Sequence, residues 1–429
     1  MVLVDVLEEY LDEAEFRWLQ WERALEAPDF TLVETAEREE RLLAYLEGLE
    51  DTDALDMVVR PAFDSEEAPR ISAAAHALLG LGEVDEVLVR LRGAGAPARA
   101  AILRAVEVSE APGLGTRLLE LLKLEDMALQ AGVLEALAVR QEAPMEVLAR
   151  FFTHEEPRAR VAALRGAHSL PEELVRRHLP ALLDSAHPGT RAAAMEAGLA
   201  SGVRMAWEAC RKDVQAPRAH AREAMVLLAL GGDEAEAALL VDLLGSAELR
   251  ADALWALGFS GRVAAMESCV KYLAVPEVAR LAGEAFSAMT GLRLEGAFAL
   301  PPGETPEGAP VPLEEEESLD ADLTPRPEDD LPWPEVAAVK DWWAQNQTRF
   351  VKGTRYLLGQ PFSGPVLLEA LESSPMRRRH VLARELAIRT GGQHVIPTRA
   401  FTWRQREALA QARGACARLK RTPLAATLR

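Results

Sequence analysis

The chain has 429 residues, of which 49% are hydrophobic, 27% charged and 5% aromatic, and its 48 Lys and Arg against 68 Asp and Glu give a net charge of −20. This apolar fraction excludes a globally disordered protein. With only four isoleucines and few aromatic residues in the chain, a β-rich fold is disfavoured, because strands are enriched in β-branched and aromatic side chains.

The cysteines and the hydropathy pattern indicate in which cellular compartment the protein is expected. Cys210, Cys269 and Cys416 are odd in number and far apart, so they predict neither a disulfide framework nor a metal-binding spacing. The first residues are acidic where a signal peptide would be basic, and no run of 18 apolar residues occurs, so no membrane segment is predicted. We therefore expect a cytoplasmic protein.

Residues 1–60 predict an acidic helical hairpin, with 18 acidic and 5 basic side chains and a net charge of −13. Apolar residues recur every three or four positions, as in an amphipathic helix. They are Val4, Leu7, Leu11, Ala14, Trp18, Trp21 and Leu25. Pro28 ends this helix because proline cannot donate into the helical hydrogen-bond ladder. A second helix is predicted over 32–49, with Leu42, Leu43 and Leu46 on its buried side.

Residues 61–298 contain a repeat in which helix starts recur every 28 to 31 residues. The predicted starts are Pro69, Pro97, Met127, Pro157, Pro188, Pro217, Ala247 and Pro276. Proline is preferred at the first helical position, where its missing N–H costs nothing. A shorter second helix closes most units, and alanine is frequent at the contacts. Helix pairs of this length predict an α-solenoid, since each pair must stack on its neighbours to bury its apolar face.

Glycines and arginines recur in register with these units. Gly80, Gly202, Gly231, Gly261 and Gly291 are predicted to end helices. Arginine occurs at similar positions in several units, at Arg160, Arg191, Arg250 and Arg280. Such arginines would form a ligand-binding ladder or pair with carboxylates and carbonyls of a neighbouring repeat, and the second interpretation is favoured.

The units resemble HEAT-like repeats of the short bacterial type, most closely in ARLAGEAFSAMTGL at 279–292. The stretches DVLEEYLDEAEFRWLQWERALEAPDF and LPWPEVAAVKDWW…RFVKGTRYLLGQP resemble the flanks of an uncharacterised family of bacterial HEAT-repeat proteins, prominent in myxobacteria. This resemblance covers nearly the whole chain except an acidic insert. It implies an α-solenoid without a known enzymatic role, and members sometimes lie near type VI secretion genes.

The acidic insert predicts a mostly disordered linker at 299–333. Residues 301–335 contain nine prolines and 12 acidic residues against one basic residue, Arg326, a composition that cannot bury enough apolar surface to fold. The carboxylate run Glu314–Glu317 raises the possibility of a calcium site, but the alternating ligands and fixed glycine of an EF-hand are missing. No metal site is therefore predicted.

Residues 334–429 predict a helical C-terminal module with a basic end. A helix runs from Pro334 through Trp342 and Trp343 to about Phe350, and a tight glycine-punctuated connection, FVKGTRYLLGQPF, follows. Further helices are predicted at 365–373, 375–390 and 402–419. Residues 376–429 contain 13 Lys and Arg against two acidic residues, a net charge of +11.

Three interpretations of the basic end remain open. It would bind nucleic acid, bind an acidic protein surface, or balance the acidic hairpin and linker of its own chain. Nucleic acid is disfavoured, because the preceding 375 residues carry −31 and would repel a polyanion. Intramolecular balance is the favoured interpretation.

Aromatic residues and arginines of this module are the best candidates for a binding site, since both are enriched at interface hot spots. The candidates are Trp342, Trp343, Phe350, Arg355, Tyr356, Arg377, Arg378 and Arg379. Adjacent helical residues point about 100° apart, so Trp342 and Trp343 are not expected to face one core, and one of them would be available to a partner. In the alternative, the aromatic residues dock the module onto the last repeat.

No catalytic set is recognisable. The chain lacks GxSxG, GxxxxGK[ST], HExxH and CxxC, and its histidines are not spaced as a zinc pair. Iron-dependent HEAT-type hydroxylases use several His-Glu dipeptides, whereas this chain has one, His154-Glu155. We therefore predict no catalytic residue and no cofactor, and a non-catalytic scaffold or adaptor for an unidentified protein partner. The alternative is an enzyme or nucleic-acid-binding protein that uses a HEAT-like concave groove.

Overall fold

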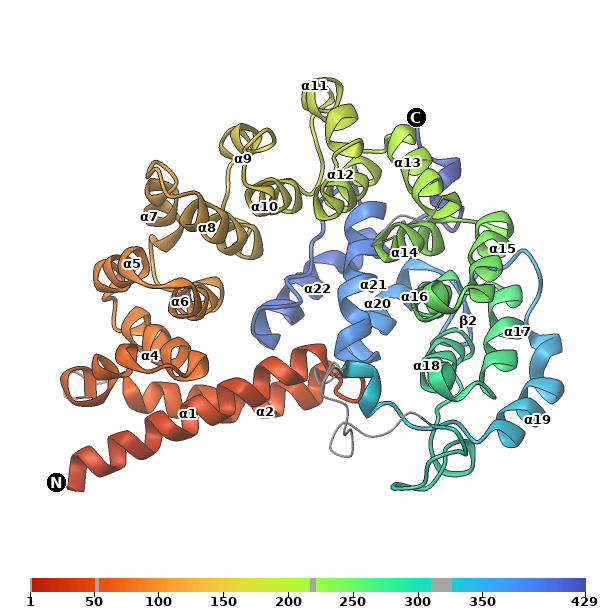
Figure 1. Ribbon diagram of the computed structural model, residues 1–429, viewed down its shortest axis with the longest axis horizontal. Coiled ribbons are helices and arrows are strands. Elements are labelled where there is room, and N and C mark those ends of the chain that lie inside the picture. Colours follow the sequence, from red (N-terminus) through yellow and green to blue (C-terminus); the bar gives the residue numbers. More distant parts are fainter. Residues whose placement is uncertain (1, 51–53, 217–220, 310–325) are drawn as a thin grey trace. The chain divides into compact units, whose positions relative to one another are not determined.

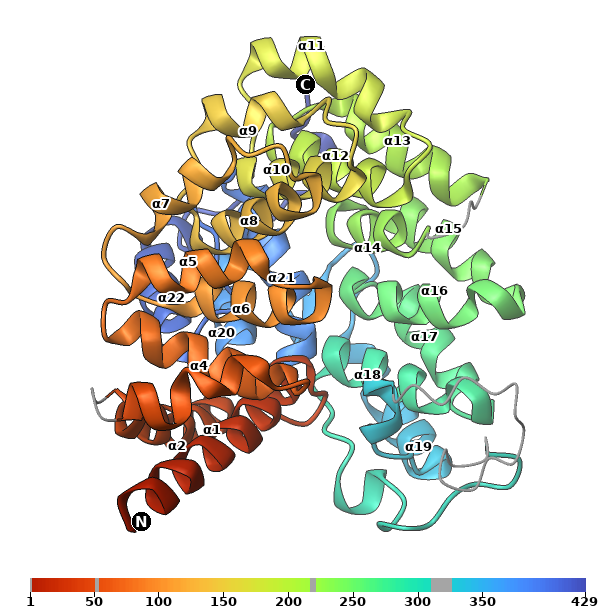
Figure 2. The same cartoon turned by 60° about the vertical axis from the view of Figure 1, so that its left-hand side comes forward.

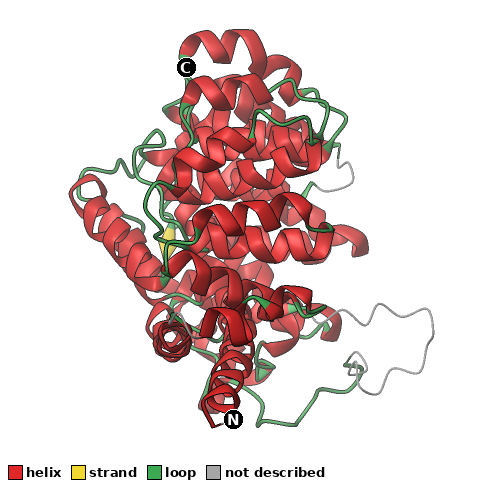
Figure 3. Ribbon diagram, turned by 90° about the vertical axis from the view of Figure 1, so that its left-hand side faces the viewer, coloured by secondary structure: helices red, strands yellow, loops and turns green. Residues whose placement is uncertain are grey.

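The computed structural model describes residues 2–50, 54–216, 221–309 and 326–429. The chain forms two compact units. The first unit comprises residues 1–26, 30–197 and 395–410, and the second unit comprises 27–29, 198–394 and 411–429. Helices account for nearly all regular structure in the described residues (Figure 3), so the expected all-α class is confirmed.

The first unit begins with the predicted hairpin, α1 (Val2–Glu26) and α2 (Leu32–Leu49), whose helices lie side by side (Figure 2). The apolar stripe from Leu7 to Leu25 is buried as predicted, whereas Leu43 is only half-buried. A capping box formed by Thr31 and Glu34 starts α2. The short turns η1 (Leu55–Val59) and η2 (Pro61–Asp64) follow.

The first unit continues as a series of helix pairs, each with a first and a second helix (Figure 1). The first helices of successive units are α4 (Ala68–Gly80), α6 (Ala96–Val108), α8 (Met127–Arg140) and α10 (Pro157–Ala167). The second helices are α5 (Val84–Gly93), α7 (Leu114–Leu121), α9 (Met145–Phe151) and α11 (Glu172–Leu183). Each first helix packs on the next, α4 on α6, α6 on α8 and α8 on α10. Their starts lie within one residue of the predicted ones.

The chain passes into the second unit within α12 (Pro188–Ala200). The helices that follow are α13 (Arg204–Gln215), α14 (Arg222–Gly231), α15 (Glu234–Asp242), η3 (Leu243–Gly245), α16 (Ala247–Ser260), α17 (Val263–Tyr272), η4 (Pro276–Val278) and α18 (Ala279–Thr290). Here α14 packs on α16 and α16 on α18. Gly261 and Gly291 end their helices with φ of 63° and 76°, the left-handed conformation that glycine adopts without strain. The predicted start at Pro217 lies outside the described residues.

The described ends of the acidic segment pair with one another. Ala299 and Pro334 form an antiparallel bridge, the Leu300 N–H donates to the Trp333 carbonyl at 2.8 Å, and the Glu335 N–H donates to the Phe298 carbonyl at 2.9 Å. Two short turns, η5 (Gly296–Phe298) and η7 (Pro327–Asp330), flank this bridge. These ends are therefore held by backbone hydrogen bonds, whereas the composition predicts a mostly disordered linker. The run Glu314–Glu317 lies outside the described residues.

The C-terminal part contains the predicted helices and one strand pair. Its elements are α19 (Val336–Asn346), η8 (Gln347–Arg349), β1 (Tyr356–Leu357), β2 (Gln360–Pro361), α20 (Gly364–Ser373), α21 (Met376–Arg389), α22 (Thr402–Cys416) and η9 (Leu424–Ala426). The glycine-punctuated connection is the β1–β2 hairpin, in which Tyr356 pairs with Pro361. The Tyr356 N–H donates to the Gly261 carbonyl at 2.8 Å and the Leu358 N–H to the Ala288 carbonyl at 2.9 Å. The hairpin thus caps the ends of α16 and α18.

The recurring arginines bind backbone carbonyls. Arg191 Nη1 donates to the Ser185 carbonyl at 2.8 Å, and Arg250 Nε donates to the Leu244 carbonyl at 2.9 Å. In the same way, Arg160 donates to the carbonyl of His154 and Arg280 to that of Asp329. These contacts support the structural interpretation of the arginines, because each one donates to a backbone carbonyl in the loop or short turn beside it.

We expect Arg140→Leu to lower the free energy of unfolding by about 2 to 3 kcal/mol, because it leaves buried carbonyls without a donor. Arg140 is buried, and its Nη1 donates to the carbonyls of Val106, at 2.8 Å, and Ser109. Urea denaturation followed by circular dichroism measures the effect. The control is Arg92→Leu on the exposed side of α5, with an expected change below about 0.5 kcal/mol. Equal effects of the two substitutions would contradict this role of Arg140.

Candidate functional site

The aromatic candidates lie against the last repeated helix. The Trp343 ring lies 5.6 Å from the Phe286 ring of α18 and 5.5 Å from the Phe350 ring, and Phe350 packs on Tyr356 at 5.0 Å. Trp342 also meets Phe286 edge-on, at 5.9 Å. Both rings touch the same phenyl group, but only Trp343 is buried, whereas Trp342 is half-buried, so the expected difference between the two side chains is seen in part. These contacts match the alternative in which the module docks onto the last repeat.

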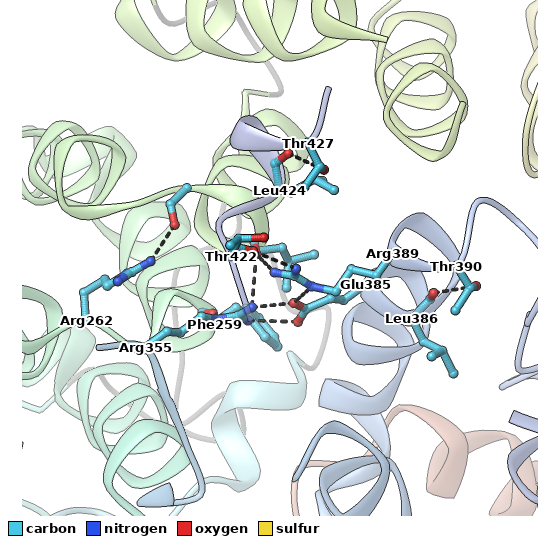
Figure 4. A network of polar contacts seen from close by, with 12 residues as sticks. Phe259, Arg262, Arg355, Glu385, Leu386, Arg389, Thr390, Thr422, Leu424 and Thr427 are labelled. Atoms are coloured by element: carbon cyan, nitrogen blue, oxygen red, sulfur yellow. Dashed lines mark hydrogen bonds and ion pairs between the residues drawn. The ribbon is translucent and has the colours of Figure 1, made fainter. Parts of the chain in front are cut away.

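Arg355 belongs to a buried ionic network (Figure 4). Glu385 is 1% exposed and accepts from Arg355 Nη2 at 2.8 Å and from Arg389 Nε at 2.7 Å. Both guanidinium groups also donate to the Leu230 carbonyl, each at 3.1 Å. They lie over the Phe362 ring, at 4.1 Å for Arg355 and 4.8 Å for Arg389. The Glu385 carboxylate thus binds both guanidinium groups, and these groups also donate hydrogen bonds to a backbone carbonyl at the C-terminal end of α14.

The charge state of this network follows from its geometry. Burial alone would raise the pKa of Glu385, but the adjacent Arg355 and Arg389 outweigh burial and hold the pKa below its usual value of 4.5. Burial lowers the pKa of Arg389, and Glu385 opposes that shift. We therefore assign an ionised carboxylate between two guanidinium cations, in which the carboxylate stabilises both cations and both cations stabilise the carboxylate.

The three consecutive arginines of α21 are also turned into the second unit. Arg377 Nε lies 3.5 Å from Glu284 Oε1, and Arg378 Nη2 donates to the Gly258 carbonyl at 2.9 Å while its guanidinium lies over the Phe259 ring. Burial lowers the pKa of Arg378 to about 10. Arg379 is fully buried and donates to the Leu371 carbonyl. None of these three side chains lies on an exposed surface of the second unit.

Several cations of the basic end pair with carboxylates of their own unit. In the second unit these pairs are Arg384–Glu223, Arg413–Glu372 and Arg377–Glu328; in the first unit they are Arg399–Glu107 and Arg404–Glu110. Glu328 comes from the acidic segment, so that segment supplies part of the negative charge that balances these cations. These pairs support charge balance within the chain, but the other four carboxylates lie outside the acidic hairpin and linker that the sequence interpretation named as the balancing charges.

The thiols are buried, and the imidazole of the one His-Glu dipeptide has a structural hydrogen bond. All three cysteines are buried, and burial raises the pKa of the Cys269 thiol to about 12, which disfavours the nucleophilic thiolate. His154 accepts from the Glu156 N–H at 3.1 Å, in the loop before α10. Within the described ranges, no three residues among His, Cys, Asp and Glu are arranged to hold a metal ion. No helix of these ranges has both the length and the apolar character needed to span a bilayer.

The outer face of α1 carries a feature that the sequence reasoning missed. Asp5, Glu9, Asp12, Phe16 and Leu19 recur at alternating intervals of four and three residues and therefore share one helix face. The aromatic and aliphatic members are exposed, by 50% for Phe16 and 38% for Leu19. We call these five residues the α1 outer stripe. The sequence did contain a signal for this surface. Phe16 and Leu19 are large apolar residues that do not belong to the series of buried positions recurring every three or four residues along the helix.

Further apolar side chains are exposed on the same hairpin. They are Val6 and Tyr10 on α1 and Val33 on α2. Exposed carboxylates also occur on both helices, at Glu8, Glu37, Glu40 and Glu47. Exposed apolar groups rimmed by polar residues are typical of protein-binding surfaces, and Phe16 and Leu19, three residues apart on one face of α1, form such a pair. The α1 outer stripe is therefore the candidate functional site.

Comparisons with known proteins give no functional assignment. No family model and no curated protein matches the chain. Among solved structures, an engineered protein aligns over 92% of this chain and 99% of its own at 17% identity, with a TM-score of 0.29. Human deoxyhypusine hydroxylase in complex with glycerol aligns over 64% of this chain and 94% of its own at 19% identity, with a TM-score of 0.26. Superpositions this poor carry no argument about the chain.

We expect Glu385→Gln to lower the free energy of unfolding by about 3 to 5 kcal/mol, because it leaves two buried guanidinium groups without their anion. The control is Glu372→Gln, which removes an exposed ion pair with Arg413 and costs at most about 1 kcal/mol. Urea denaturation at neutral pH compares the two variants, and equal effects would contradict the role of Glu385.

The same pair of proteins tests the pH dependence of the network. The pKa of Glu385 lies below 4.5 in the fold, so its stabilisation is complete above about pH 4.5 and is lost as the pH falls further. Wild type and Glu385→Gln are therefore expected to approach one another in stability as the pH falls below about 4.5. A difference that stays constant over that fall would show that the carboxylate charge is not the source of the effect.

Proposed function

We propose that the protein is a non-catalytic binding scaffold, built as an α-solenoid of HEAT-like helix pairs, and that the α1 outer stripe binds its protein partner. The 28-to-31-residue period of the repeat and the packing of each first helix on the next, as in α4 on α6, support the solenoid. The observation that carries the binding role is the exposure of Phe16 and Leu19 beside carboxylates of the same stripe.

The chemistry of the stripe defines the partner. Asp5 and Glu9 form no ion pair with any residue of the described chain, whereas Asp12 pairs with Arg70 at 2.6 Å. A complementary segment would place cations opposite the first two turns of the stripe and apolar side chains opposite Phe16 and Leu19. A basic amphipathic helix meets both requirements, because its cations and apolar groups lie at helical spacing. Opposite charge would speed association, and burial of the apolar pair would slow dissociation.

The place of this scaffold in the cell is proposed on the family resemblance alone. The resemblance supports a cytoplasmic bacterial adaptor that works beside type VI secretion components. The sequence repeat and the hairpin chemistry are compatible with that role, and the partner remains defined by its basic amphipathic character.

A capture experiment with matched variants tests the stripe. Immobilised wild type, Phe16→Ser/Leu19→Ser and Val89→Ser are incubated with host lysate, and bound proteins are identified by mass spectrometry. Val89 on α5 is 66% exposed and lies in the first unit away from the stripe, so its substitution controls for general loss of exposed apolar surface. We expect proteins that wild type and Val89→Ser retain and the double variant loses.

The bound proteins should carry basic amphipathic segments, and synthetic peptides of those segments should bind wild type more weakly as salt increases. Substitution of Asp5 and Glu9 by Lys should weaken peptide binding by about tenfold or more. Identical protein sets for all variants, or peptide binding that is independent of salt and of these carboxylates, would contradict the proposal.

A further inference from the structure

The first half of α22 has an exposed face that combines an aromatic ring with a cation. The buried side of this helix includes Gln405 and Leu409, which are 0% and 2% exposed. Trp403, Arg406 and Ala410 follow one another at intervals of three and four residues and therefore share another face of the helix. All three are exposed, Trp403 by 43%. We call these three residues the α22 outer face.

The α22 outer face is held in place on the first unit. The Thr402 N–H, at the start of α22, donates to the buried carboxylate of Glu39 on α2 at 2.8 Å. The Trp21 ring of α1 packs on Phe401 with centroids 4.8 Å apart. Because these contacts already order the start of α22, a partner that binds its outer face loses little free energy in ordering it.

Trp403 and Arg406 can each make an interaction that the described chain does not supply. No aromatic or cation–π contact joins Trp403 to a described residue, and Arg406 forms no ion pair with one. Among the described residues, the electrostatic partner of Arg406 is the buried Glu39. Tryptophan and arginine are enriched among interface hot spots. The α22 outer face is therefore suited to bind a surface that carries carboxylates and exposed apolar groups.

The α1 outer stripe carries those groups, and it carries them in the complementary order. From its N-terminal end, the stripe runs from carboxylates to the apolar pair Phe16 and Leu19. The α22 outer face runs in the opposite sense, from Trp403 to Arg406. If the two helices pack antiparallel, the apolar groups of both meet and the cation meets the carboxylates.

The spacing along the two helices agrees with this pairing. A helix rises about 1.5 Å per residue, so Arg406 lies about 4.5 Å from Trp403 along the axis of α22. On α1, Asp12 lies about 6 Å from Phe16 along the axis. When the two aromatic rings are opposite one another, Arg406 therefore lies opposite Asp12. Glu9 follows about one turn further along α1, within reach of a long arginine side chain.

The two surfaces do not meet within one copy of the chain. Phe16, Leu19 and Trp403 are exposed by 50%, 38% and 43%, which a contact between them would prevent. Both surfaces belong to the first unit. Each copy therefore offers an acidic and apolar surface and its basic and aromatic complement to other molecules.

We propose that the α1 outer stripe of one copy binds the α22 outer face of a second copy, so that the basic partner of the stripe is the chain itself. This inference rests on the proposed function, because it names the partner of the same stripe. The two contacting surfaces differ, so the interface is heterologous and joins copies head to tail, into a closed ring or an open chain.

Sedimentation velocity of the full chain tests self-association. The weight-average sedimentation coefficient of wild type is expected to rise with protein concentration, because association follows mass action. It is expected to fall as salt is added, because salt screens the pairing of Arg406 with the carboxylates. A wild-type protein that stays monomeric at every concentration in low salt would overturn the proposal.

Two variants remove the contact from opposite sides. Phe16→Ser/Leu19→Ser disables the stripe, and Trp403→Ser/Arg406→Glu disables the α22 outer face. Each is expected to weaken self-association by about tenfold or more. The control Arg418→Glu reverses the charge of an exposed arginine in the second unit and should assemble as wild type does. A mixture of the two variants contains one intact stripe and one intact α22 outer face, so it should form heterodimers.

The mixture also separates a lost contact from a lost fold, since only folded variants can restore each other. Circular dichroism checks each variant, and Arg406→Glu alone replaces Trp403→Ser/Arg406→Glu if the latter does not fold. A mixture of folded variants that stays monomeric, or self-association that either variant leaves unchanged, would overturn the proposal. If wild type is monomeric but captures other basic segments through the stripe, only the second copy is excluded as the partner. If it captures none, the proposed function fails as well.

Discussion

The last carbonyl groups of an α-helix have no partner within the helix, and where helix ends are buried another group must satisfy them. In this protein arginine side chains do so repeatedly. At the end of α14 the Leu230 carbonyl accepts from Arg355 and Arg389, and at the end of α16 the Gly258 carbonyl accepts from Arg378. Cations at these ends also oppose the negative pole of the helix dipole. The C-terminal part of the second unit therefore supplies hydrogen-bond donors to the carbonyl groups at the ends of α14 and α16.

A buried guanidinium group needs an anion, and this second requirement explains the charge distribution. Glu385 balances two arginines, and Glu284 lies beside Arg377 and Arg378. In the sequence these cations resemble a polyanion-binding tail, but in the structure several of their side chains are buried in the interior of the unit. In the acidic hairpin, Glu22 pairs with the buried Arg104, and Asp12 and Glu15 pair with Arg70, while other carboxylates such as Asp5 and Glu9 are exposed. The exposed carboxylates of α1 and α2 agree with the basic partner proposed above.

Local signals predicted most of the fold. Proline at the first helical position set the starts of α10 and α12, and glycine with positive φ ended α16 and α18. These features could be predicted because they depend on a few neighbouring residues. The 3.6-residue periodicity likewise identified the buried stripe of α1, and hence the helical hairpin.

The site could not be predicted in the same way. A run such as Arg377–Arg379 is typical of an exposed basic patch, and only tertiary packing turns all three side chains inward. The contact between Glu39 and Thr402 joins residues 363 positions apart, and no local rule pairs them. In the sequence, Phe16 and Leu19 stand out as apolar residues outside the buried periodicity of α1. Their exposure, however, depends on the absence of a covering helix in the described chain.

The antiparallel bridge between Ala299 and Pro334 has a consequence for the helix that follows it. The Leu300–Trp333 and Phe298–Glu335 hydrogen bonds join the two sides of the acidic segment. The place where α19 starts is therefore set by this pairing and not by the length of the chain between the paired residues.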